Sequence, residues 1–140
     1  MVLFFKGDHG MRLIVLIFAC SLLFGCAATG YHPAKDHFSG GYTDLKVGPG
    51  MHRISFEGNA YITGEKAYQY TLFRAAEITK QNNCDWFEII DTNEMSRRDF
   101  AGFLGYVEKP RNSIVIKLFK EEPPKNAYSA DEILKSITIK

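Results

Sequence analysis

Two charged residues near the middle of the chain, Arg74 and Glu77, have the types and the spacing that could do chemistry. Residues three apart on a helix lie on the same face, so the arginine could poise a partly buried carboxylate for acid–base work. The same spacing is typical of an ion pair that only fixes the orientation of a helix. Because no nucleophile or histidine accompanies them, we interpret Arg74 and Glu77 as a structural pair.

Cys84 and His52 are the other reactive residue types inside the predicted fold. A reactive cysteine needs cationic neighbours or a helix N-terminus, which favour the thiolate. Cys84 instead follows the expected C-terminal end of a helix and precedes Asp85, so we predict a packed and inert thiol. His52 begins a predicted strand and has no obvious carboxylate partner in the sequence, which indicates a solvated histidine.

Two more histidines, His32 and His37, flank Asp36 in a segment that mixes glycine, alanine, proline and polar residues. These side chains could bind a metal ion, but a segment without periodicity lacks the fixed geometry that a metal site requires. We therefore interpret them as solvated linker residues. Gly58 and Asn59 could line a small-ligand crevice or mark the end of a strand. With no glycine-rich phosphate loop and no Ser-His-Asp set in the sequence, we predict no catalytic residue, metal or cofactor.

The overall composition indicates one ordinary globular domain. The chain has 140 residues, of which 46% are hydrophobic and 24% charged, and its formal net charge is +1. This length fits a single domain, and the small charge provides no electrostatic reason to expect nucleic acid as a partner. An aromatic content of 14% argues against disorder.

The N-terminal region has the pattern of a signal peptide. An apolar run at 13–24 follows Arg12, and it is shorter than the ~20 residues that span a bilayer. A positive residue before a short apolar core is typical of a secretory signal. Met11 stands directly before Arg12, so translation is expected to start either there or at Met1.

The end of this apolar run, Leu23-Phe24-Gly25-Cys26, resembles a bacterial lipobox. The resemblance implies cleavage before Cys26, which would carry a diacylglycerol thioether and an acylated amino group. Several acyl chains give stable anchoring, whereas one chain binds only marginally. Ala27 stands where an aspartate would signal inner-membrane retention in enteric bacteria, which favours the outer membrane. A buried helix or an uncleaved membrane anchor is the alternative.

These features divide the chain into three parts. Residues 1–25 are the predicted signal peptide, residues 26–41 the lipidated cysteine with a flexible tether, and residues 42–140 a periplasmic domain. Of the three cysteines, Cys84 would remain as the one free thiol, so no intramolecular disulfide is expected despite an oxidising compartment.

The periplasmic part shows strand and helix patterns in turn. Period-two alternation predicts strands, and apolar residues three and four apart predict helices. The expected elements are strands at 42–47 and 52–62, a helix at 65–81, strands at 84–91 and 113–120, and a short helix from about 130. Residues 92–112 are expected to form a long connection. The order β-β-α-β-β-α predicts a two-layer α+β sandwich with about four strands, one long helix and a short C-terminal helix.

Turn and cap residues predict the ends of these elements. They are a hairpin turn at 48–50, the helix N-caps Thr63 and Ser129, and a left-handed stop at 82–83.

Three stretches of the domain, GYTD at 41–44, RISFEGNAYIT at 53–63 and YTLFRAAEIT at 70–79, resemble a family of small uncharacterised proteobacterial lipoproteins. The shared features are a Gly-Tyr-Ser/Thr start, a Phe-x-Gly-Asn-x-x-Thr segment and an Arg-Ala-Ala-Glu helix, together with the lipobox. The resemblance covers about residues 41–91. It implies outer-membrane or periplasmic placement and no particular activity.

The segment 97–107, RRDFAGFLGYV, is the expected partner-binding surface. Phe100, Phe103 and Leu104 have helical spacing, and the glycines around them limit that helix to one turn that presents apolar side chains. Arg97 and Arg98 add a residue type that accompanies aromatic anchors at interfaces. The alternative is that these aromatics cover the sheet face that the long helix leaves open.

Together these features predict an outer-membrane lipoprotein whose periplasmic α+β domain binds another envelope protein and has no catalytic activity. A lipid-anchored hydrolase or transferase that uses Glu77 or Cys84 is the alternative. An enzyme should place one of these side chains in an open cleft beside a second polar group. A binding module should pack both away and expose an apolar patch elsewhere.

Overall fold

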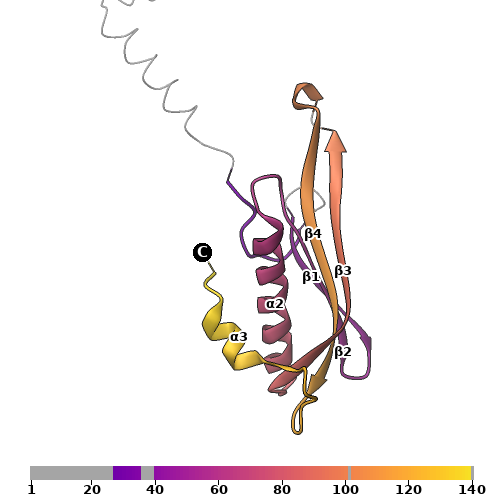
Figure 1. Ribbon diagram of the computed structural model, residues 1–140, viewed down its shortest axis with the longest axis vertical. Coiled ribbons are helices and arrows are strands. Elements are labelled where there is room, and N and C mark those ends of the chain that lie inside the picture. The colour runs from indigo at the N-terminus through magenta and orange to yellow at the C-terminus, as the bar shows by residue number, and fades with distance from the viewer. Residues whose placement is uncertain (1–26, 36–39, 101, 140) are drawn as a thin grey trace, which may run out of the picture.

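The computed structural model describes residues 27–35, 40–100 and 102–139. The predicted signal peptide, Cys26 and His37 lie outside these residues, as do the side chains of Met95 and Leu104. Figure 1 shows a long twisted sheet with both helices on the same side of it. In chain order the elements are β1 (Gly41–Gly48), β2 (Met51–Glu57), α2 (Gly64–Gln81), β3 (Trp86–Phe100), the 3₁₀ turn η1 (Gly102–Leu104), β4 (Tyr106–Phe119), β5 (Tyr128–Ser129) and α3 (Ala130–Ser136).

The predicted two-layer α+β fold is confirmed, and the sheet is larger than expected. Its five strands have the order β1-β2-β4-β3-β5, and each neighbouring pair is antiparallel. The fifth strand is the short β5, which pairs with the start of β3 through Trp86 and Phe87. Because β4 lies between β2 and β3, the two strands that flank α2 in sequence run parallel without being neighbours.

Both helices begin at their predicted N-caps, and α2 ends at the predicted stop. Thr63 Oγ1 accepts a hydrogen bond of 3.1 Å from the backbone N–H of Lys66, which opens α2. Asn83 follows its last turn in the left-handed conformation, with a φ of 56°. Ser129 caps α3 by accepting from the backbone N–H of Glu132. The two N-caps and the left-handed stop are therefore confirmed.

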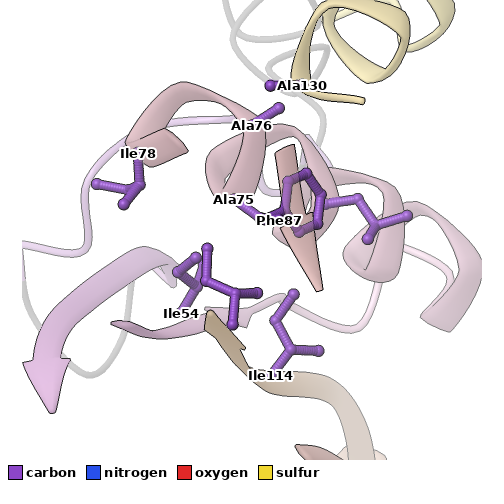
Figure 2. Packing of buried hydrophobic residues seen from close by; sticks show 9 residues of the cluster. Ile54, Ala75, Ala76, Ile78, Phe87, Ile114 and Ala130 are labelled. Carbon is purple, nitrogen blue, oxygen red and sulfur yellow. The ribbon is translucent and has the colours of Figure 1, made fainter. Parts of the chain in front are cut away.

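The hydrophobic core lies between one face of α2 and one face of the sheet (Figure 2). The sheet contributes the fully buried Ile54, Phe87 and Ile114. The helix contributes Ala75, which lies toward the sheet, and Ala76, which lies beside Ala130 at the start of α3 (Figure 2). The residues spaced three and four apart that predict this helix, among them Leu72 and Thr79, are thus on its buried face.

The prediction of a long connection at 92–112 is wrong, because these residues extend β3 and β4 into a long antiparallel hairpin. A bulge at Ile90 shifts the register between Ile89 and Asp91. The side chains after the bulge therefore point to the opposite sheet face from the one that simple alternation would give. Beyond this bulge the strands carry polar residues on both faces, so their sequence has no apolar alternation. Backbone hydrogen bonds between the strands, which leave no mark in the side-chain pattern, hold this part together.

The sheet face opposite α2 is polar. Arg53, Ser55, Arg111 and Ser113 lie on it, and Ser55 Oγ donates a hydrogen bond of 2.8 Å to Ser113 Oγ. An antiparallel sheet can present one polar face to water while its other face is packed. This face therefore has no need of the aromatic cover that the sequence offered as an alternative use of residues 97–107.

Candidate functional site

Arg74 on α2 lies at the centre of a charged cluster. Its guanidinium donates to Asp44 Oδ1 on β1, with Nε at 2.9 Å and Nη2 at 2.8 Å, and to Glu77 Oε2 through Nη1 at 2.9 Å. It also lies over the ring of Tyr42, with Cζ 4.5 Å from the ring centroid. Burial opposes the charged form, but the hydrogen bonds to Glu77 and Asp44 outweigh burial and raise the pKa of Arg74 above its ordinary value.

Tyr31, from the predicted tether, completes this cluster. Its hydroxyl donates to Glu77 Oε2, and its ring packs against Tyr42, Tyr70 and Phe73 at centroid distances of 4.7, 5.6 and 5.2 Å. Burial, followed by the bond to the carboxylate, raises the pKa of the Tyr31 hydroxyl. Spacing rules did not point to Tyr31. The feature of the sequence that could have indicated its role is that Tyr31 is a large aromatic residue inside a run of small and polar residues.

Residues 27–35, which we call the clasp, lie along the domain. Asn59 holds the clasp at three points: its N–H donates to Thr29 Oγ1 at 2.9 Å, its Oδ1 accepts from the N–H of Thr29 at 3.2 Å, and its Nδ2 donates to the carbonyl of Ala27 at 2.8 Å. Tyr42 on β1 exchanges two backbone hydrogen bonds of 2.9 Å with the clasp. The segment expected to be a tether therefore begins as a packed part of the domain.

Glu77 has little freedom to act as a catalytic acid or base. Its Oε2 accepts hydrogen bonds from both Tyr31 and Arg74, and its side chain is only 30% exposed. A general acid or base must reach a substrate with an available proton or lone pair. The geometry fits the interpretation of Arg74 and Glu77 as a structural pair, which Tyr31 extends into a fastening for the clasp.

Cys84 lies apart from this cluster, at the corner between α2 and β3. It is half-buried, and its Sγ lies 3.6 Å from the carbonyl oxygen of Asn82. His32 Nδ1 lies 3.0 Å from the carbonyl oxygen of Pro33. Within the described parts of the chain, no three His, Cys, Asp or Glu side chains gather in a way that could hold a metal ion.

The prediction of a solvated His52 is wrong. Only 8% of this residue is exposed, and its Nε2 has no hydrogen-bond partner among the residues that the structure describes. The alternation of β2 places His52 on the same face as Ile54, which packs under α2. Burial, and next the charge of Lys46, lower the pKa of His52 against the opposing effect of Asp44.

Among the cavities that the described residues line, three bear on the candidate residues. A cavity of about 510 Å³ lies between the first turn of α2 and the β3–β4 hairpin, near Tyr68, Glu94 and Asn112. A mostly apolar groove of about 430 Å³ is lined by residues 28–30 of the clasp and by Tyr61 and Tyr70. A polar recess of about 260 Å³ lies on the open sheet face. Neither Glu77 nor Cys84 lines any of these three cavities.

The far end of the β3–β4 hairpin, residues 97–109, forms a projection that we call the arm. Four ladder pairs, from 97↔109 to 100↔106, extend it beyond the body, and η1 closes its end. Phe100, Phe103 and Tyr106, which we call the tip, are 70, 97 and 75% exposed. Phe100 and Tyr106 touch edge to face, with ring centroids 5.6 Å apart.

The structure places the expected partner-binding residues on this arm. The expected helical turn is wrong in part: only Gly102–Leu104 form a turn, the 3₁₀ turn η1, whereas Phe100 lies in β3 and pairs with Tyr106 of β4. Phe103 is too exposed to cover a sheet face. Arg98 is exposed, whereas Arg97 binds Asp99 at 2.9 Å and lies 3.9 Å from Glu57.

The comparisons with known proteins found no relatives. No protein-family model matches the chain, and neither a curated protein nor a solved structure is significantly similar to it. Within the described residues, no helix is both long enough and apolar enough to cross a membrane. The resemblance to proteobacterial lipoproteins stays a prediction.

Proposed function

We propose that this chain is an outer-membrane lipoprotein, anchored through Cys26, whose periplasmic domain works as an interaction module. Its contact surface is the tip of the arm, and the partner expected from the sequence is another protein of the envelope. The proposal assigns no reaction and no cofactor to the domain.

The observation that carries the proposal is the exposure of the tip. Large apolar side chains that stay out of a core mark interaction sites when they gather in one place. The tip gathers three aromatic rings, and two ion pairs of Asp99, with Arg97 at 2.9 Å and Lys109 at 2.8 Å, brace the arm behind them. A projection that is held by ion pairs and ends in exposed aromatic rings is suited to contact a partner.

A catalytic role for Glu77 or Cys84 gains no support from the geometry. Glu77 is engaged by Tyr31 and Arg74. Cys84 lies just after the C-terminal end of α2, its Sγ is 3.6 Å from the carbonyl oxygen of Asn82, and it lines none of the three cavities described above.

Anchoring is tested by the substitution Cys26→Ser. We expect labelling with radioactive palmitate to disappear and the unprocessed precursor to accumulate in the membrane fraction. Equal labelling of the parent and the variant would refute the lipoprotein assignment.

The contact surface is tested by a photo-crosslinking amino acid placed at Phe103 in living cells. We expect adducts, with a protein or with lipid, from this position and few from the matched control position Leu45, an exposed apolar residue on β1. Adducts of equal yield at both positions, or at neither, would contradict the assignment of the tip.

A further inference from the structure

The clasp fixes where the membrane anchor leaves the domain. Asn59, which lies shortly before α2, binds Thr29 and the carbonyl of Ala27. Cys26 is the residue directly before Ala27. Because consecutive Cα atoms are about 3.8 Å apart, the lipid attachment point lies close to this fastened residue. If Cys26 carries lipid, as the proposed function requires, the bilayer must lie close to the end of the domain where α2 begins.

The arm projects from this same end of the molecule. The first turn of α2, at Gly64 and Glu65, faces the hairpin at Ser96 and Pro110. Four further ladder pairs extend the arm about 14 Å past that level, at about 3.4 Å per pair. Figure 1 shows the indigo start of the described chain and the tip of the arm both at the end where α2 begins.

The chemistry of the arm changes along its length. Its shaft carries charged side chains, among them Arg98, Asp99 and Lys109, whereas its tip carries two phenylalanines and a tyrosine. Aromatic side chains are enriched at membrane interfaces, where their apolar rings meet the acyl region and basic residues meet the headgroups. A charged shaft below an apolar tip matches this order of layers.

The shape of the tip also favours lipid over protein. A specific protein interface buries about 800 Å² on each partner, with its anchors near the centre of the patch. The tip is the narrow end of a two-stranded hairpin, and Phe103 at 97% exposure has almost no neighbours that could surround it. A fluid bilayer can accept such a projection without a complementary surface.

We propose that the tip inserts into the lipid bilayer that holds the Cys26 anchor, so that the domain is attached to one membrane at two points. The apolar groove between the clasp and Tyr70 lies at the same end, with Lys66 on its rim. This inference rests on the proposed lipid anchor and names the lipid surface as the partner of the proposed contact site.

The single tryptophan of the chain provides a matched test. Trp86 stands at the start of β3, about 45 Å along the strand from Phe100. The lipidated full chain is reconstituted into vesicles of phosphatidylethanolamine and phosphatidylglycerol that carry bromine on their acyl chains, which quench nearby tryptophan. The probe is the double variant Trp86→Phe with Phe103→Trp, and the control is the parent with its native Trp86.

We expect the tip tryptophan to lose about half of its emission or more, and to shift to shorter wavelength, because it enters the hydrocarbon layer. The native Trp86 should keep its emission. An unquenched tip, or equal quenching at both positions, would overturn the inference. Phe103 is exposed and Trp86→Phe keeps an aromatic ring, so we expect the double variant to keep the fold, which circular dichroism checks.

Failure of the inference can be distinguished from failure of the proposed function. The mass of the N-terminal peptide before reconstitution reports whether Cys26 carries lipid. An unquenched tip on a lipidated chain, together with protein adducts from Phe103 in cells, would leave the interaction module standing with a protein as its partner. Absence of lipid on Cys26 would refute the proposed function itself.

Discussion

The clasp cluster and the arm tip use aromatic and charged residues in opposite ways. Around Tyr31 the rings pack against one another, and the charges of Arg74 and Glu77 are engaged within the domain. At the tip, Phe100 and Phe103 remain in solvent, and the ion pairs lie behind them in the shaft. The charged side chains that the sequence offered for chemistry are used in contacts within the domain, whereas the aromatic side chains of the tip make few contacts. This difference supports the proposal that the tip is a contact surface.

The largest loss of stability is expected when a buried phenylalanine is truncated. Phe56 on β2 is fully buried and lies edge to face with Tyr70 at 5.1 Å, beneath the clasp. Phe56→Ala should lower the free energy of unfolding by about 3–5 kcal/mol because it leaves a cavity in the core. Urea denaturation of the purified domain measures this loss. A loss below about 1 kcal/mol would mean that the clasp side is not a packed core.

Removing Glu77 from the cluster with Tyr31 and Arg74 should cause an intermediate loss of stability. Glu77→Ala removes the acceptor of both Tyr31 and Arg74, and the partial exposure of the pair limits the cost to about 1–2 kcal/mol. The same variant should increase proteolytic cleavage within residues 27–35. Glu77→Gln keeps a carbonyl acceptor and should lie between the parent and Glu77→Ala. Unchanged stability with a lost cellular phenotype would point instead to a functional acid.

The buried His52 should make stability depend on pH. Its pKa in the fold is lower than the ordinary value of about 6.5 in the unfolded chain. The unfolded chain therefore takes up the proton more readily, and the free energy of unfolding should fall as the pH drops from 7 toward 5. His52→Leu should reduce the change in melting temperature over this interval. An equal change in the parent and the variant would assign the pH dependence to other groups.

The smallest effect is expected at the tip. Phe103→Ala should change the free energy of unfolding by no more than about 0.5 kcal/mol, because an exposed side chain loses no packing. The same variant should weaken attachment of the domain to its partner surface. A loss of stability near that of Phe56→Ala would place Phe103 in a core and remove the contrast between the two regions.

Local patterns in the sequence determined most of the domain. The α+β class and the long helix follow from periodicity, and the short helix follows from its capping residues. Thr63 and Ser129 each accept a hydrogen bond from a backbone N–H three residues later, and Asn83 takes up the left-handed conformation that ends α2. These interactions span only a few residues, so the sequence records them directly. The Arg74–Glu77 pair is predictable for the same reason, because one helical turn separates its members.

Only the tertiary structure decided the contacts between distant segments. Tyr31 reaches Glu77 across 46 residues, and Asn59 reaches Thr29 across 30. The extension of β3 and β4 into an arm depends on backbone hydrogen bonds between the strands, which any polar side chain permits. The sequence by itself determined which residues are aromatic and charged. Packing decided that Tyr31 fastens the N-terminal segment while Phe103 stays exposed, because burial depends on which surfaces meet.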